Sequence, residues 1–391
     1  MMTNRIVGDD PVGGPVEHPT GQGERPARRA LLLSGSLGMG HDVMAQACAH
    51  SLALRGFSTR TVDSLRMMGG RAGSAGEGVF RGMLAVPGLY DAVHFSQMRP
   101  GGWLSRAIET TSSRFLVPKL RLELRDHPVE LVLSIFATGA AAASRLKSGH
   151  SRLVTAVFCT DVCVHRLWVH DNTDLYLVTS TTAARFVRRF HPQARIAVVP
   201  TPVRQPFYDP PTQEAARKAL RIPTDARCVL LMSGSWGLGP LVEGARALAG
   251  SGVWVLVVAG RNVSLAARLR DLATTHPQVV PFGFTDRIPE LMAASDLVIT
   301  SSGDTCSEAR IIGRDLLLLD VVPGHGRDNL QLELDRGRAD VTSADAVSLR
   351  RSALAALDRT KPPSVRVVGT PEDWEQAFSA ALSQVELANG W

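Results

Sequence analysis

A strand-and-glycine-loop segment occurs twice in this chain of 391 residues, and no other feature constrains its fold as strongly. The first copy reads LLLSGSLGMG over residues 31–40, and the second reads LLMSGSWGLG over residues 230–239, at a constant offset of 199 residues. In each copy a short apolar run ends in closely spaced glycines, which is typical of a buried parallel strand that turns tightly into a helix. Two such openings predict two tandem α/β domains of similar size.

Strand-like and helix-like segments alternate after each glycine loop. This alternation predicts an α/β fold with two Rossmann-like, doubly wound parallel sheets, each covered by helices on both faces. Ligands of such sheets bind outside the carboxyl ends of the strands, so we expect the two domains to face a common cleft. The expected strands are residues 29–33, a run ending at Asp63, 130–135, 153–158, 175–179 and 196–199, then 228–232, 253–258, 279–284, 297–300 and 316–319.

A proline-rich stretch indicates where the two domains join. Residues 200–211 read PTPVRQPFYDPP, with five prolines in twelve residues, which excludes a regular helix and favours an extended linker. We therefore expect a first domain over residues 29–205 and a second over residues 206–370. Residues 1–28 are rich in Pro, Gly and acidic residues and predict a disordered leader. The apolar pattern of residues 371–391 predicts a helix that packs back on the first domain.

Composition excludes several other classes of protein. Hydrophobic residues make up 45% of the chain, which is too apolar for general disorder, and no apolar run reaches the ~18 residues that a bilayer crossing needs. The first residues lack a signal-peptide core, and the odd number of cysteines, five, favours a reduced, cytoplasmic protein. The net charge of +6 comes from arginine, since only four of the 43 basic residues are lysines. It reflects either compositional bias or attraction to anionic lipids and phosphorylated substrates.

The glycine loops have a G-x-x-G-x-G spacing, which is neither the G-x-G-x-x-G dinucleotide fingerprint nor a P-loop. At a helix N-terminus, such a loop offers unpaired N–H groups and the positive end of the helix dipole to a phosphate or an oxyanion. A tight turn that binds no ligand is a sufficient explanation for one such loop. It is a weaker explanation when the same loop occurs twice. Asp63, at the end of the second strand, leaves an NAD-dependent enzyme open as an alternative.

Short motifs in a fixed order resemble those of the monogalactosyldiacylglycerol synthase family. They are residues 34–41 (SGSLGMGH), Thr160-Asp161 with His165 and Trp168, residues 202–204 (PVR) with Phe207, residues 283–286 and 295–300, and Pro323-Gly324 with Asn329. The resemblance covers about residues 29–340. Members of this family are inverting glycosyltransferases of the glycosyltransferase-B fold, related to the peptidoglycan N-acetylglucosaminyltransferase. The resemblance therefore implies a lipid acceptor on the first domain and a UDP-sugar on the second.

The resemblance also implies which residues hold the nucleotide sugar. An arginine in the position of Arg204 neutralises the leaving diphosphate by forked hydrogen bonding. A carboxylate in the position of Glu308 accepts hydrogen bonds from the ribose hydroxyls. The nucleotide-sugar-binding residues expected in this way are Arg204, Gly234, Ser235, Gly237, Phe284, Thr305, Glu308, His325 and Asn329.

His41 follows the first glycine loop directly and is the first candidate catalytic residue. An imidazole can take the proton of an acceptor hydroxyl as that oxygen attacks the anomeric carbon. Its alternative role is that of a helix cap or a packing residue. Asp161 is the second candidate, either as the base or as an acceptor contact. The acceptor-binding residues implied by the resemblance are Gly38, Gly40, His165 and Trp168.

The CTDVC segment invites a metal site built from Cys159, Asp161, Cys163 and His165. The resemblance argues against it, because glycosyltransferases of this fold work without a bound metal. We expect no metal and no other cofactor, since the UDP-sugar is a substrate.

Residues 99–125 combine Trp103, Phe115 and other apolar side chains with several arginines. This composition is typical of a surface helix that lies on an anionic membrane. An amphipathic core helix with solvated arginines explains it equally well.

These patterns predict a glycosyltransferase of glycolipid biosynthesis that moves a hexose from a UDP-sugar to a lipid hydroxyl, expected to be that of diacylglycerol. The expected partners are the UDP-sugar, the lipid and an anionic membrane surface, but no nucleic acid. The expected location is the cytoplasm, peripherally on the inner face of the cell membrane. One alternative acceptor is a small secondary-metabolite aglycone. A catalytically impaired nucleotide-sugar-binding protein is the other alternative, because Asp304, His325 and Gly326 depart from the residues usual in the family.

Overall fold

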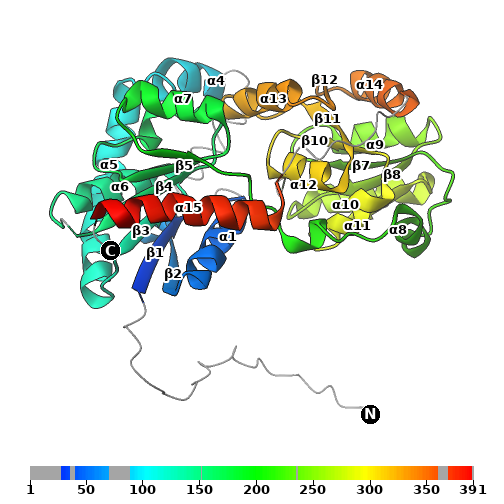
Figure 1. The fold of residues 1–391 in the computed structure, drawn as a ribbon. Coiled ribbons are helices and arrows are strands. Elements are labelled where there is room, and N and C mark those ends of the chain that lie inside the picture. The colour runs from blue at the N-terminus through cyan, green and yellow to red at the C-terminus, as the bar shows by residue number, and fades with distance from the viewer. Residues whose placement is uncertain are drawn as a thin grey trace, which may run out of the picture.

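The computed structural model describes residues 28–35, 40–69, 89–150, 152–234, 237–359 and 369–389. Within these ranges the chain forms two lobes, each built on a six-stranded sheet with helices on both faces (Figure 1). The strand orders are β2-β1-β3-β4-β5-β6 and β12-β11-β10-β7-β8-β9, and neighbouring strands pair in parallel. The predicted pair of doubly wound Rossmann-like sheets is confirmed. The expected leader lies outside the described residues, apart from Arg28.

The first sheet takes its inner strands from the most apolar runs of the sequence. Leu31, Leu32 and Leu33 are all buried, because helices cover both faces of the sheet and each successive side chain meets one of them. Ile196 and Ala197, on the edge strand, are only partly buried. The strands are β1 (Arg28–Ser34), β2 (Phe57–Asp63), β3 (Leu131–Ser134), β4 (Val154–Cys159), β5 (Leu175–Val178) and β6 (Ile196–Val198).

Polar residues start several helices of this domain. The side chain of Asp63 accepts hydrogen bonds from the backbone N–H groups of Leu65 and Arg66, and Ser180 caps its helix in the same way. Asp63 is thus engaged locally, away from the ribose-binding role that an NAD-dependent enzyme would require. The helical segments are α1 (Gly40–Leu54), α2 (Ser64–Met67), α4 (Leu89–Val93), the π-helical η1 (His94–Met98), α5 (Trp103–Asp126), α6 (Ala137–Lys147), η2 (Arg166–Trp168) and α7 (Thr181–Phe190).

The second domain repeats this plan after the short η3 (Gln205–Phe207). Its strands are β7 (Cys228–Met232), β8 (Trp254–Val258), β9 (Val279–Phe282), β10 (Leu297–Thr300), β11 (Asp315–Leu319) and β12 (Ala339–Thr342). Its helices are α8 (Gln213–Leu220), α9 (Leu241–Ala249), α10 (Val263–Thr275), α11 (Ile288–Ala294), α12 (Asp304–Ile312), α13 (His325–Asp335) and α14 (Ala346–Asp358). The sequence reasoning missed β12, because this edge strand is mostly half-buried and has no apolar run.

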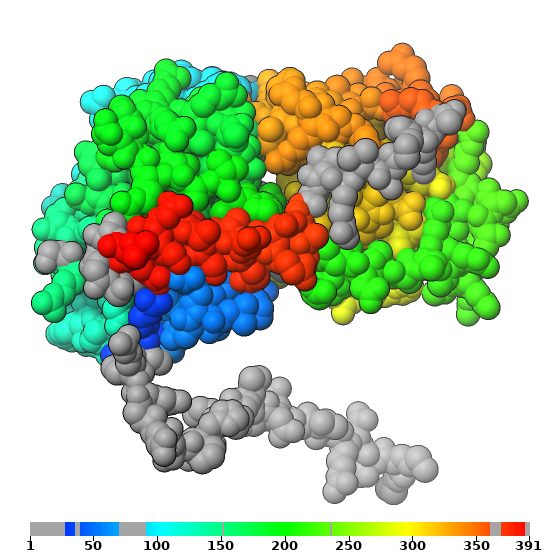
Figure 2. Space-filling model, viewed as in Figure 1, coloured from blue at the N-terminus to red at the C-terminus, as the bar shows by residue number. Residues whose placement is uncertain are grey.

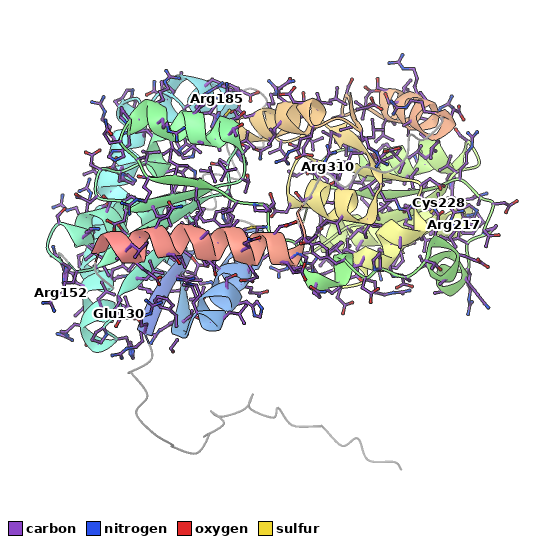
Figure 3. The ribbon with its side chains drawn as sticks, viewed as in Figure 1. Glu130, Arg152, Arg185, Arg217, Cys228 and Arg310 are labelled. Carbon is purple, nitrogen blue, oxygen red and sulfur yellow. The ribbon has the colours of Figure 1, made fainter. Side chains whose placement is uncertain are left out.

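Two arginines stiffen the second domain (Figure 3). Arg217 donates to Asp296 at 2.8 Å, and Asp296 in turn accepts from the backbone N–H of Cys228 at 2.9 Å. Arg310 donates from Nε to Glu333 at 2.9 Å, and both side chains of this second pair are buried. The Arg310 pair ties α12 to α13, so the two helices behave as one support for the residues at their N-termini.

The last described helix, α15 (Pro371–Asn389), returns to the first domain and lies across its face (Figures 1 and 2). Trp374 and Phe378 are buried in the same core as α1 and the first sheet. The indole Nε1 of Trp374 donates to Ser51 at 2.9 Å, and Arg55 pairs with Glu386 at 2.6 Å. The chain therefore passes twice between the lobes, once through residues 200–211 and once just before α15.

Trp374→Ala is expected to destabilise the protein by about 3–5 kcal/mol, because it leaves a cavity in the first core and removes the hydrogen bond from the indole to Ser51. Urea unfolding followed by far-UV circular dichroism measures this loss. Leu387→Ala is the matched control, since Leu387 lies on the same helix with 84% of its side chain exposed, and it should change stability by less than about 0.5 kcal/mol. Equal effects of the two variants would show that the docking of α15 contributes little.

Candidate active site

A cleft of about 960 Å³ lies between the lobes and is lined by residues of both. It opens at the carboxyl ends of strands such as β1, β4, β7 and β10, where ligands of parallel sheets bind. The predicted site residues that line it are Gly40, His41, Asp161, His165, Trp168, Arg204, Gly234, Phe284, Thr305, Glu308 and His325. Gly38 and Ser235 lie outside the described residues. The sequence motifs thus converge from both domains.

His41 is the second residue of α1. Its Nδ1 lies 3.0 Å from the backbone oxygen of Ile135, and its ring packs edge-on against Phe136. A carbonyl oxygen only accepts hydrogen bonds, so Nδ1 carries the proton and Nε2 of the neutral ring keeps its lone pair. His41 is therefore held in the tautomer that a proton acceptor requires.

Asp161 follows β4 and is held by two side chains of its own loop. Trp168 Nε1 donates to its Oδ2 at 2.8 Å, and His165 Nε2 lies 3.4 Å from the same oxygen. Burial opposes ionisation, but these contacts and the charges of His165 and His325 outweigh it, so the pKa of Asp161 lies well below its usual range. Asp161 is therefore a poor proton acceptor and a strong organiser of neighbouring donors.

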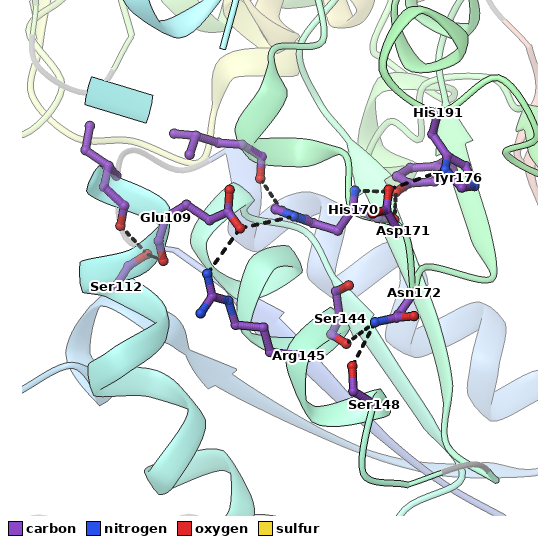
Figure 4. A network of polar contacts seen from close by, with 12 residues as sticks. Glu109, Ser112, Ser144, Arg145, Ser148, His170, Asp171, Asn172, Tyr176 and His191 are labelled. Atoms are coloured by element: carbon purple, nitrogen blue, oxygen red, sulfur yellow. Dashed lines mark hydrogen bonds and ion pairs between the residues drawn. The ribbon is translucent and has the colours of Figure 1, made fainter. Parts of the chain in front are cut away.

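A polar network behind this loop fixes its position (Figure 4). His170 donates from Nε2 to the backbone oxygen of Leu167 at 2.9 Å, and its backbone N–H donates to the hydroxyl of Tyr176 at 2.8 Å. Glu109 of α5 lies 3.8 Å from His170 and 3.4 Å from Arg145 of α6. Burial lowers the pKa of His170, which favours its neutral form. The loop that carries Asp161 is thus tied to two helices and a strand.

The side of the cleft formed by the second domain contains an ion pair. Arg204 donates to Glu308 at 3.0 Å, and its guanidinium lies 5.0 Å from the centre of the Phe207 ring. Burial raises the pKa of Glu308, and the charge of Arg204 acts against that rise. Because the side chain of Arg204 remains 40% exposed, one face of the cation is accessible to an anion entering the cleft.

Two further predicted residues line this wall in different environments. His325 is the first residue of α13, and burial lowers its pKa although Asp161 acts in the opposite direction. It is therefore suited to neutral hydrogen bonding. Phe284 presents 57% of its side chain, with the Arg261 guanidinium 5.0 Å from its ring centre, so it offers an aromatic surface.

Gly237 and Asn329 do not line the cleft. A β-carbon on Gly237 would lie 2.5 Å from Leu265, and its φ of +61° is left-handed, so a side chain is excluded by packing and backbone geometry alike. Asn329 Oδ1 instead accepts from the backbone N–H of Val162 at 3.4 Å. The structure places this asparagine in a contact between the two domains.

Helix α13 also forms a bridge to the α4–η1 segment, which lies next to it at the junction of the lobes (Figure 1). Asp91 accepts from the backbone N–H of Gly324 at 2.6 Å and pairs with Arg327 at 2.9 Å. Asp328 lies 3.3 Å from His94 and 3.5 Å from Arg99. Sequence reasoning missed this interdomain bridge. Its partners are separated by some 230 positions in the chain, and no motif indicates that they are in contact.

Cys159 and Cys163, which belong to the CTDVC segment, are buried free thiols. Burial raises the pKa of the Cys159 thiol and brings that of Cys163 to about 12, which disfavours the thiolates that bind metals. Nowhere in the described ranges do three or more His, Cys, Asp or Glu side chains form a group suited to a metal ion.

Helix α5 has two distinct faces. Leu104 and Ile108 line the cleft, together with Met44 of α1, so the first domain gives it an apolar wall. Trp103 and Leu122 point outward, with 71% and 51% of their side chains exposed. In the part of the chain that the structure describes, no helix is both long and apolar enough to cross a bilayer.

Comparison with known proteins identifies relatives of this chain. The family model of monogalactosyldiacylglycerol (MGDG) synthase matches residues 74–203. A processive diacylglycerol beta-glucosyltransferase of Bacillus pumilus is 30% identical over 220 residues, which cover 55% of this chain and 57% of that protein. Monogalactosyldiacylglycerol synthase 3, chloroplastic, of Arabidopsis thaliana is 25% identical over 382 residues, which cover 88% of this chain and 80% of that protein.

Solved structures agree on the fold. MurG of Acinetobacter baumannii matches with a TM-score of 0.53 at 12% identity, over 94% of this chain and 100% of that chain. The chain spans 57–63% of the length of the three Bacillus relatives, all processive diacylglycerol beta-glucosyltransferases.

Asp161→Asn is expected to cost about 1–3 kcal/mol of stability at pH 7, because the favourable contacts of the carboxylate are lost. The pKa of Asp161 is lower in the folded state than in the unfolded chain. The contribution of the Asp161 carboxylate to the free energy of unfolding is therefore present above about pH 4 and is lost as the pH falls further. Urea unfolding of both proteins from pH 7 to pH 3 should show the difference shrinking. Asp171→Asn, at a side chain that is 82% exposed, is the control, and a constant difference would contradict the assignment.

Proposed function

Since the chain belongs to the monogalactosyldiacylglycerol synthase-like family of glycosyltransferases, we propose that it transfers a hexose from a UDP-sugar to the hydroxyl of diacylglycerol, with inversion. One observation carries the proposal: a single cleft presents the lone pair of His41 from the first domain opposite the Arg204–Glu308 pair. A base and an anion-binding cation facing one space are what such a transfer requires. The acceptor follows from relatives named as diacylglycerol glucosyltransferases.

In the proposed reaction, Nε2 of His41 takes the proton of the acceptor hydroxyl as its oxygen bonds to the anomeric carbon. The bond from that carbon to the diphosphate breaks on the opposite face, and UDP leaves with the electron pair. Arg204 neutralises the charge that develops on the diphosphate. Asp161 stays ionised and holds Trp168 and His165 against the acceptor side. No metal or other cofactor takes part in this scheme.

The apolar wall of the first domain suits the acyl chains of the acceptor. Met44, Leu104, Ile108 and Phe115 line the cleft, and Phe115 is also 48% exposed at the surface. Apolar side chains that continue from a cleft to the outer surface offer a lipid a route without full exposure to water. We therefore place α5 at an anionic membrane surface, on the inner face of the cell membrane.

Incubation with UDP-galactose, UDP-glucose or UDP-N-acetylglucosamine and diacylglycerol, with mass detection of the glycolipid, tests the proposal. His41→Ala should lower turnover by about 10²–10⁴ while the affinity for UDP stays unchanged, because the base is lost and the nucleotide site is intact. His50→Ala is the matched control, since His50 is an exposed histidine on the same helix. Turnover of His41→Ala equal to that of the wild type would exclude His41 as the base.

Binding of UDP without transfer to any acceptor would identify a nucleotide-sugar-binding protein instead. Transfer to small soluble aglycones, but not to diacylglycerol, would replace the lipid acceptor.

Trp103→Ala should weaken binding to anionic vesicles several-fold in flotation assays, because an exposed indole inserts at the headgroup level. Binding of the wild type should also fall as salt rises, because arginines of α5 attract the surface. Leu54→Ala is the control, since Leu54 is 65% exposed on α1, which covers the opposite face of the same sheet. Equal vesicle binding by the wild type, Trp103→Ala and Leu54→Ala would show that Trp103 of α5 does not contact the membrane.

A further inference from the structure

Asp304 reaches from the second domain to the first residue of α1. It begins α12, directly after Gly303, and its carboxylate projects into the cleft. A β-carbon placed on Gly40 would overlap Oδ2 of Asp304. The absence of a side chain at Gly40 therefore allows the carboxylate to lie against the residue that precedes His41.

The carboxylate of Asp304 stands at the positive end of the α12 dipole, but no cationic side chain of its own domain pairs with it among the described residues. No described residue donates a hydrogen bond to it, although water in the cleft reaches it. Enclosure between the two domains raises the pKa of Asp304, and the charge that acts against this rise is that of His41. Asp304 of the second domain thus lies against the residue that precedes His41 of the first domain, and the charge of His41 acts on its carboxylate.

The other groups around this pair are already engaged. His41 uses Nδ1 toward Ile135, so only Nε2 is left for chemistry. Besides Asp304 on α12, a titratable group that acts on His41 is His325 on α13, whose pKa burial lowers. On Asp304's own helix, Glu308 is paired with Arg204. Asp161 interacts with His165, Trp168 and His325. Asp304 is therefore the carboxylate whose charge is available to His41.

We propose that Asp304 is a positioning residue for the transfer, whose carboxylate stabilises the imidazolium that His41 becomes when it takes the acceptor proton. This inference rests on the proposed function. The proton moves from the acceptor oxygen to Nε2 of His41, and Asp304 remains ionised and accepts none. An anion fixed beside a developing cation stabilises the transition state without having to reorganise. Because the base and its counter-ion belong to different domains, the base is strengthened only when the lobes are closed.

The first test does not depend on turnover. NMR titration of the histidine rings compares the wild type with Asp304→Asn, which keeps the shape of the side chain and removes its charge. The His41 signals are identified with a His41→Gln variant. Their titration midpoint should move to lower pH by about one unit, because the imidazolium loses its counter-ion. Asp271→Asn on α10, an exposed acid outside the cleft, should leave it unchanged.

The second test is the pH profile of kcat/KM with the donor and diacylglycerol. Asp304→Asn should lower kcat/KM about tenfold at pH 7 and leave KM for the donor unchanged. The acidic limb of the pH profile should move to lower pH, as the His41 titration midpoint does. A merely structural role would lower activity without moving the limb.

Three results would overturn the inference. An unchanged His41 titration in Asp304→Asn would show that the two charges do not interact. A lower KM for the donor together with a higher kcat would show that Asp304 obstructs the donor. A titration shift between the wild type and Asp304→Asn, in a protein whose wild type transfers no sugar, would contradict the proposed function and, with it, the catalytic role of the pair.

Discussion

The docking of α15 on the first domain is the contact on which the cleft depends. A chain that passed between two lobes once would leave them free to separate, but here Trp374 and Phe378 anchor a second passage in the first core. Two passages restrict the lobes to a hinge-like opening. The carboxyl ends of the two sheets therefore stay opposite each other, and every functional contact across the cleft follows from that restraint.

The charged side chains of the cleft differ in where their partners lie. Most of its charges are neutralised within one domain or within the linker, as Asp161 is by Trp168 and His165, and Glu308 is by Arg204. Such local pairing is expected where protein replaces water, because an unpaired charge is costly there. Asp304 differs, since the side-chain charge that acts against its raised pKa comes from the opposite domain. It is also one of the positions at which the chain departs from the motifs it otherwise resembles.

The sequence predicted the sheets well, because strands buried on both faces must be apolar throughout, as residues 31–33 and 316–319 show. Most of the site residues that it indicated line the cleft, since parallel strands deliver the loops that follow them to one edge. It did not indicate contacts between residues that lie far apart in the sequence. Nothing in the sequence marked the contact of Asn329 with Val162, and Asp91 carried no signal although it meets Gly324. The edge strand β12 lacked the apolar run that identified the others.

The distribution of groups over two domains also bears on how water is excluded in the proposed reaction. Neither domain alone contains the complete set, because His41 and Trp168 belong to one wall while Glu308 and His325 belong to the other. An open cleft would therefore hold the donor without an assembled base, so hydrolysis would not be promoted. The interdomain bridge joins the lobes in this structure, but each of its hydrogen bonds contributes only about 0.5–1.5 kcal/mol. Closure held by a few such bonds is strong enough to assemble the site and weak enough to release the product.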